Sequence, residues 1–167
     1  MMMTPEIPSN ELERVCALQE LQMLDTPPET RFDDITQEAM SYFQVPIALV
    51  SLVDSTRQWF KSCQGLGASE TDRNISFCGH AINHDDILYV PNALEDLRFS
   101  TNPLVLGEPF IRFYAGAPLI IRANVRVGTL CIIDSQPREF SDEELAVLRE
   151  LANVVQYELC TSPANSA

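Results

Sequence analysis

The chemically reactive residue types of this chain gather between Ser76 and His84. Ser76, Cys78 and His80 fall within five residues, and the other of the two histidines, His84, follows four positions later. A thiol at the N-terminal end of a helix favours thiolate chemistry, and residues four apart on a helix share one face. Reactive side chains on one short connector between two strand-like segments are typical of a pocket wall.

Each of these residues has two interpretations. Cys78 is either a nucleophile, redox sensor or ligand contact, or a buried thiol that packs as a small hydrophobe. His80 either hydrogen bonds a ligand and holds Cys78, or bonds to the backbone. We expect no metal, because a closed zinc site needs four ligands and no further Cys/His group supplies the rest.

A second set of candidates lies on a predicted strand at 110–121. Alternation along it predicts two faces. One face packs on helices and carries Ile111, Phe113, Ala115, Ala117 and Leu119; the other faces a polar site and carries Phe110, Arg112, Tyr114 and Gly116.

Arg112 is expected in mid-strand beside Tyr114, where a buried cation needs an anion. Its partner is either an acidic side chain such as Asp96 or Glu108, or a ligand carboxylate or phosphate bound bidentately. Trp59, the only tryptophan, either covers a ligand as a lid or covers the sheet. Ser76 is expected to cap its helix, where free amides would hold an anion.

Composition limits the class of protein. The net charge of −13, from 11 basic and 24 acidic residues, argues against nucleic acid and anionic membranes as partners. No apolar run reaches the roughly 18 residues that span a bilayer, and no signal peptide is apparent. Five scattered cysteines, an odd number without a C-x-x-C pair, favour reduced thiols in a cytoplasm.

The pattern of elements predicts one α+β domain with an antiparallel sheet at 10–160, after a disordered lead at 1–9 and before a flexible tail at 161–167. Two helices open it, the second capped by Thr26 with Pro27 at its first position. A hairpin follows at 46–63, then a short helix after Ser76, strands at 87–90, 110–121 and 125–133, and loops at 64–74 and 103–109. A final helix begins at a Ser141–Glu144 capping box. Its main apolar stripe is Leu145, Leu148, Ala152, Val155 and Leu159, and a second stripe, Val147, Leu151 and Val154, is left for a partner helix.

Seven segments in order resemble the GAF domain, a small-molecule sensory module found ahead of bacterial histidine kinases and cyclic-di-GMP enzymes. They are LDTP at 24–27, PIALVSLVD at 46–54, RQWFKS at 57–62, SFCGHAI at 76–82, NPLV at 102–105, IRFYAGAPL at 111–119 and GTLCIID at 128–134. The resemblance implies a central antiparallel sheet with the terminal helices on one face and a ligand pocket, closed by short helices, on the other.

The resemblance also bears on cofactors. The Asn-Lys signature of cyclic-nucleotide members is missing, since Pro103 follows Asn102, and Gly79 separates Cys78 from His80, unlike in bilin-binding members. We therefore expect no cofactor. The resemblance places Asp96 at the outer wall of the pocket, where it is alternatively a turn former.

These observations predict a non-catalytic, cytoplasmic, bacterial sensory domain that binds an unidentified small molecule and signals through a protein partner. A homodimer through the terminal helices is expected. The expected ligand contacts are Trp59, Ser76, Phe77, Cys78, His80, Asp96, Arg112 and Tyr114. Two alternatives remain: a thiol redox enzyme or sensor using Cys78, with Cys131 resolving, and a dimerisation module without a ligand.

Overall fold

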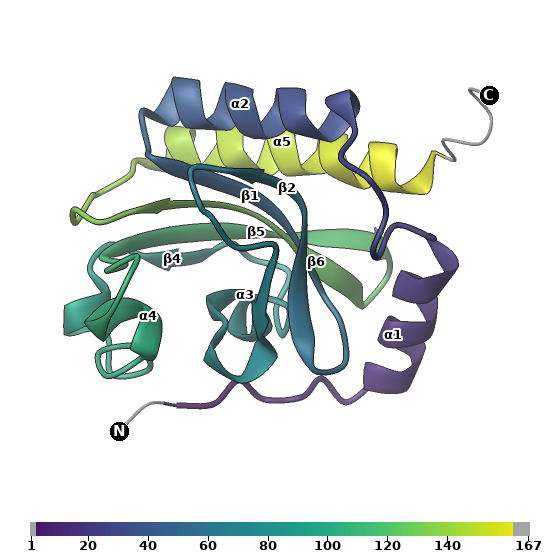
Figure 1. The fold of residues 1–167 in the computed structure, drawn as a ribbon, viewed down its shortest axis with the longest axis horizontal. Coiled ribbons are helices and arrows are strands. Elements are labelled where there is room, and N and C mark those ends of the chain that lie inside the picture. Colours follow the sequence, from purple (N-terminus) through teal and green to yellow (C-terminus); the bar gives the residue numbers. More distant parts are fainter. Residues whose placement is uncertain (1–2, 162–167) are drawn as a thin grey trace.

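A six-stranded antiparallel sheet organises the molecule, with strand order β3-β2-β1-β6-β5-β4 (Figure 1). The computed structural model describes residues 3–161. The strands are β1 Ile47–Val53, β2 Arg57–Gln64, β3 Glu70–Asp72, β4 Leu88–Val90, β5 Phe113–Arg122 and β6 Val125–Asp134. The helices are α1 Glu11–Glu20, α2 Thr30–Phe43, α3 Phe77–Ala81, α4 Pro103–Leu106 and α5 Asp142–Cys160, with short 3₁₀ turns η1 Arg73–Ile75 and η2 Ala93–Glu95. The predicted α+β class is confirmed.

The sheet separates two apolar cores. The helix-side core joins one sheet face to α1, α2 and α5, and includes Phe32, Ile35, Phe43, Leu148, Ala152 and Val155. The cavity-side core joins the other face to α3 and its neighbours, and includes Leu49, Phe77, Phe99, Tyr114 and Cys131. In Figure 1, α2 and α5 run side by side above the sheet, while α3 and α4 lie below it. The short helices therefore occupy the face that the long helices leave free.

The strands follow from burial and alternation. All seven residues of β1 are buried, as expected of a strand covered on both faces. On β5, Phe113, Ala115 and Ala117 belong to the helix-side core, and Tyr114 belongs to the cavity-side core. Ile111 was expected with the first set, but it lies in the cavity-side core, because the strand and its alternation begin only at Phe113.

The start of the second helix differs from the prediction. Helix α2 begins at Thr30 and not at Pro27. The cause is Lys61 on β2, whose buried ammonium donates to Thr26 Oγ1 and to the Pro27 carbonyl, each at 2.7 Å, and pairs with Glu29 at 2.7 Å. Because these groups are bound by Lys61, Glu29 does not close a capping box on Thr26. Lys61 thus keeps residues 26–29 out of the helix.

Among the other predicted elements, one capping box is confirmed and two predicted loops contain short elements. The capping box of α5 is confirmed: Ser141 Oγ accepts from the Glu144 amide, and Glu144 accepts from the Ser141 amide. The loops predicted at 64–74 and 103–109 hold β3, η1 and α4. Asn102 caps α4 by accepting from the Leu104 amide at 2.8 Å, a short-range signal that the sequence analysis overlooked. Within residues 3–161, no helix combines the length and the apolar character needed to cross a bilayer.

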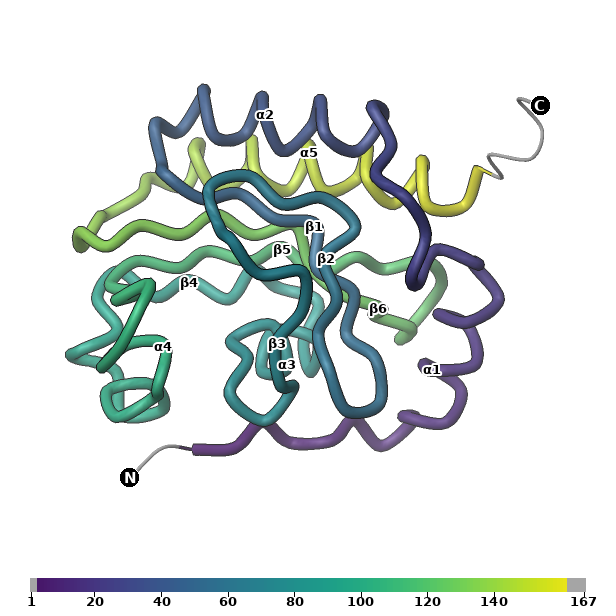
Figure 2. The backbone as a smooth tube through the Cα atoms, viewed as in Figure 1, coloured from purple at the N-terminus to yellow at the C-terminus, as the bar shows by residue number. Residues whose placement is uncertain are grey.

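Residues 3–8, which we call the N-terminal strap, differ from the disordered lead that was expected. They cross the outer side of α3 (Figure 2). The Met3 carbonyl lies 3.1 Å from His80 Nε2, Asn83 donates to the Glu6 carbonyl at 3.0 Å, and Pro5 is buried. These contacts order the strap. The predicted C-terminal tail lies outside the described residues from position 162 onward.

Candidate functional site

A cavity of about 500 Å³ lies between the sheet and the short elements α3 and α4. Its wall is mostly apolar. The polar members of the wall come from four strands, one helix and one loop: Gln58, Thr71, Cys78, Glu108, Tyr114 and Cys131. Four lining residues that are exposed to solvent, Gly65, Gly67, Glu108 and Phe110, define what we call the mouth. A cavity of this size suits a small molecule.

The inner end of the cavity holds a thiol bonded to two hydroxyl groups. Ser76 caps α3 by accepting from the Gly79 amide at 3.0 Å, and this fixes where the helix that carries Cys78 begins. The Cys78 sulfur lies 3.2 Å from the Tyr114 hydroxyl and 3.1 Å from Thr129 Oγ1. Gly116 is required here, because a Cβ at that position would lie 2.2 Å from the Tyr114 hydroxyl oxygen.

These contacts control the ionisation of the thiol. Burial alone would raise the pKa of Cys78, but hydrogen bonds from Cys131, Thr129, Tyr114 and Ser51 lower that pKa to about 7. The contact with Cys78, together with burial, raises the pKa of Cys131 well above its usual value. Burial and the neighbouring sulfurs raise the pKa of Tyr114 as well. Cys78 is therefore the thiol of this cluster that ionises most readily.

Of the eight predicted contacts, Phe77, Cys78 and Tyr114 line the cavity together, and Cys131 joins them. Phe77 also stacks on Phe99 with ring centroids 4.0 Å apart. The other five, which are Trp59, Ser76, His80, Asp96 and Arg112, do not line it.

Three of these five have structural partners instead. Trp59 is buried in the helix-side core, on the opposite face from the cavity, so it covers the sheet. Asp96 pairs with Arg98 at 2.7 Å beside the 3₁₀ turn η2. His80 faces the strap, where its ring nitrogen meets the Met3 carbonyl. Burial lowers the pKa of His80, and the nearby Arg98 cation adds to that effect.

Arg112 corrects a prediction. It precedes β5, and its guanidinium donates to the carbonyls of Val105 at 2.9 Å and Ile111 at 3.0 Å. Neither Asp96 nor Glu108 is its partner. The carbonyl of Val105 belongs to α4, where the sequence predicts a loop, and side-chain types carry no signal for a backbone acceptor.

Sequence reasoning missed Gln58, Thr71 and Glu108 as lining residues. Phe110 does line the cavity, as its place in the site-facing set of the alternation predicts, although it lies before β5. Gln58 donates to Thr71 Oγ1 at 2.7 Å and accepts from Ser51 at 2.8 Å. Alternation around Trp59 was a usable signal for Gln58, because strand neighbours point to opposite faces. No such signal existed for Glu108, which lies outside helices and strands.

Within residues 3–161, no cluster of three or more His, Cys, Asp or Glu side chains is placed to hold a metal ion. What the arrangement can do chemically is enclose a small molecule and present one activated thiol to it.

Comparisons with known proteins agree with this architecture. The chain is 41% identical over 161 residues to a cyclic di-GMP phosphodiesterase of Pseudomonas aeruginosa; the match covers 96% of this chain and 27% of that protein. Two solved structures share the fold. The GAF domain of a Coxiella burnetii phosphoenolpyruvate-protein phosphotransferase matches with a TM-score of 0.67 at 17% identity, over 95% of this chain and 99% of its own. The corresponding Acinetobacter domain matches with a TM-score of 0.65 at 20% identity, over 90% and 93%.

The family model for the GAF domain matches residues 27–159. That range begins just before α2 and ends within α5, so it contains the whole sheet and every residue that lines the cavity. On this match and the shared fold, the chain belongs to the GAF domain family.

Proposed function

We propose that this chain is a non-catalytic regulatory domain that binds a small molecule in the cavity and acts through a second protein or domain. The cavity carries this proposal: about 500 Å³ of space opens on the one sheet face that no long helix covers. A domain held together only by packing would fill such a space with side chains. Ligand contact with Phe77 and Cys78 would bear directly on α3.

Cyclic di-GMP turnover is the output that we favour. The support is the 41% identity to a cyclic di-GMP phosphodiesterase of which this chain spans 27% of the length. The enzymatic activity of that relative belongs in our proposal to a partner of this domain. A bacterial cytoplasm is the compartment we propose, since all five cysteines are free thiols.

A homodimer through the terminal helices forms part of the proposal. The outer surface of α5 exposes Val154 and Tyr157, at 47% and 70%, and the neighbouring α2 exposes Tyr42 at 58%. Val147 and Leu151, which were expected to meet a partner helix, instead pack against the core of their own chain. The candidate interface is therefore a smaller apolar surface than the sequence indicated.

Native mass spectrometry of protein purified from its own cytoplasm, compared with the denatured sample, tests ligand binding. We expect an extra mass that denaturation removes. Leu104→Trp introduces an indole at a lining position of α4, whereas Leu106→Trp places one on the same helix at a residue that does not line the cavity. The extra mass should disappear from the first variant and persist in the second. Its absence from the wild-type protein would favour a dimerisation module without a ligand.

A thiol redox function is the second candidate, favoured by the hydrogen bonds that activate Cys78. Hydrogen peroxide would supply the oxidising equivalents: the Cys78 sulfur attacks one oxygen, the O–O bond breaks, and the other oxygen leaves as water, which gives a sulfenic acid on Cys78. The Cys131 thiol then displaces a second water to form a disulfide. Sulfenate trapping should label the wild-type chain after peroxide treatment and not Cys78→Ser; equal labelling of both rejects this function.

A further inference from the structure

We propose that the ligand of the cavity is a small, largely apolar molecule with one protonated amine, whose ammonium group lies beside Glu108 at the mouth. This inference rests on the proposed function, because it names the chemical class that the same cavity takes. It follows from where the charged side chains of the whole chain lie.

No basic side chain lines the cavity. All 11 basic residues fall within residues 3–161, and each has partners elsewhere. Nine pair with acidic side chains: Arg14, Arg31, Arg57, Lys61, Arg73, Arg98, Arg122, Arg126 and Arg138. The remaining two, Arg112 and Arg149, donate to backbone carbonyls. A phosphate or carboxylate buried here would have no cation to compensate it, which is costly.

The polar groups at the inner end of the cavity are already satisfied. Cys78 contacts the hydroxyl groups of Tyr114 and Thr129. Gln58 is held between Ser51 and Thr71. These groups therefore make little demand on a ligand, and the apolar wall formed by the rest of the lining suits a hydrocarbon body.

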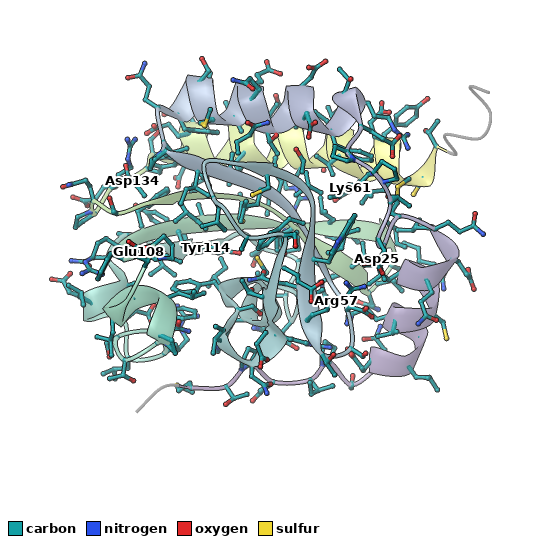
Figure 3. All side chains as sticks on the ribbon, in the orientation of Figure 1. Asp25, Arg57, Lys61, Glu108, Tyr114 and Asp134 are labelled. Carbon is teal, nitrogen blue, oxygen red and sulfur yellow. The ribbon has the colours of Figure 1, made fainter. Side chains whose placement is uncertain are left out.

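The mouth, in contrast, carries an unpaired negative charge. Glu108 is exposed, and among the described residues it forms no salt bridge. Figure 3 shows Glu108 and Tyr114 on the side of the sheet where α4 lies. Phe110, also at the mouth, is 44% exposed and holds a φ of 57°, a conformation that a bulky side chain rarely adopts. A carboxylate beside an exposed aromatic ring is a favourable environment for an ammonium group.

The net charge of the whole chain also favours a positively charged ligand. A net charge of −13 attracts cations to the surface and repels anions. The aromatic residues Phe60, Phe77 and Tyr114 add rings to the wall, and the faces of such rings attract cations as well. A monocation with an apolar body therefore fits the mouth and the interior together.

Three probes with one ring system test the charge preference: 1-naphthylmethylamine, 1-naphthylmethanol and 1-naphthoate, titrated into the dialysed wild-type chain by calorimetry at pH 7. We expect the amine to bind at least about tenfold more tightly than the naphthoate, with the alcohol between them. Glu108→Gln should weaken binding of the amine by about threefold to tenfold and leave the affinity for the alcohol unchanged. Glu95→Gln removes the same charge from an exposed residue that does not line the cavity, and it should leave the affinities for the amine and for the alcohol unchanged.

The outcomes separate this inference from the proposed function. If the naphthoate binds as tightly as the amine, or if Glu95→Gln and Glu108→Gln weaken the amine equally, the inference is overturned while ligand binding stands. If no probe binds, the inference is overturned, and the extra mass in native mass spectrometry still decides the proposed function. If binding survives Leu104→Trp unchanged, the cavity is not the ligand site and both proposals are overturned.

Discussion

At the scale of single residues, the short helix α3 separates two side chains that the sequence places together. Residues two apart on a helix point about 200° from each other. Cys78 therefore points to the sheet and the cavity, while His80 points away to the N-terminal strap. The sequence predicts that both lie on one connector, and this is confirmed. Which of them meets the cavity depends on the direction in which α3 is packed, and that is set by tertiary contacts.

The Tyr114 hydroxyl helps to keep the Cys78 thiol acidic, so its removal should slow the reaction of that thiol. One hydrogen bond contributes roughly 0.5–1.5 kcal/mol to the stability of the thiolate. In Tyr114→Phe, Cys78 should therefore react with iodoacetamide at pH 7 about twofold to tenfold more slowly than in the wild-type chain. Site-resolved mass spectrometry of the alkylated peptides measures this rate. Thr129→Val, which removes the other hydroxyl contact, should act in the same direction.

The matched control is Tyr157→Phe, because Tyr157 is exposed on α5 and lies on the opposite side of the sheet. Cys78 should react in this variant at the wild-type rate. If Tyr114→Phe also leaves that rate unchanged, or accelerates it, the hydroxyl contact does not stabilise the thiolate.

His80 gives the fold a dependence on pH. Burial lowers its pKa below the usual value of 6.5, Arg98 adds to this, and the Met3 carbonyl, Asp96 and Glu6 oppose it. Between the lowered pKa and 6.5 the unfolded chain binds more protons than the folded chain, so the free energy of unfolding rises with pH there. This stability is complete above pH 6.5 and is lost as pH falls below it.

Urea unfolding between about pH 5.0 and 6.5 measures this effect, because Cys78, with its pKa of about 7, titrates above that range. The lowered pKa values of Glu11, Glu29 and Asp96 act below about pH 4.5, outside this range. His80→Gln should flatten the profile, and His84→Asn should retain the wild-type slope. A profile of His80→Gln that is as steep as that of the wild-type chain would assign the pH dependence to another group.

At the scale of elements, local patterns predict those elements whose partners are local. The stripe on α5 and its capping box lie within one segment, and both are confirmed. The start of α2 is different, because Lys61 on β2, more than thirty residues away, binds the turn before it. Such a long-range hydrogen bond overrides helix propensity there. Arg112 fails for a different reason: its acceptors are the backbone carbonyls of Val105 and Ile111, and side-chain types do not report backbone acceptors.

A buried charge cluster fixes α1 to the rest of the fold. Glu11 pairs with both Arg14 and Arg73, whose side chains are only 1% and 3% exposed. Glu11→Gln leaves these two cations without their counter-ion, and should lower the free energy of unfolding by roughly 3 kcal/mol. Urea denaturation of the two proteins measures the difference.

Glu13→Gln is the control on the same helix. Glu13 approaches Arg122 only to 3.8 Å, and both side chains are more than half exposed, so the expected cost is below about 1 kcal/mol. Equal costs for the two variants would show that burial of Arg14 and Arg73 does not set the strength of the cluster.

At the scale of the whole molecule, the cavity is built from segments that are distant along the chain. Gln58 and Thr71 come from β2 and β3, and Glu108 and Phe110 come from the segment before β5. Hydrophobic alternation predicts that the sheet has two covered faces, because it reports burial along one strand. It does not report which loops meet over the sheet, so the mouth and its unpaired carboxylate required the structure.

The proposed dimer is also a property of the whole molecule. If Val154 and Tyr157 on α5 meet a second copy, light scattering should give a mass twice the 18.7 kDa of one chain. A charge placed in an apolar contact is unfavourable, so Val154→Glu should shift the population toward the monomer. Leu97→Glu adds the same charge at a residue that is 85% exposed and lies outside helices and strands, and should leave the dimer intact. If the wild-type chain is a monomer, or if both variants dissociate equally, the outer face of α5 is not the dimer interface. Signalling by this domain would then have to pass through another surface.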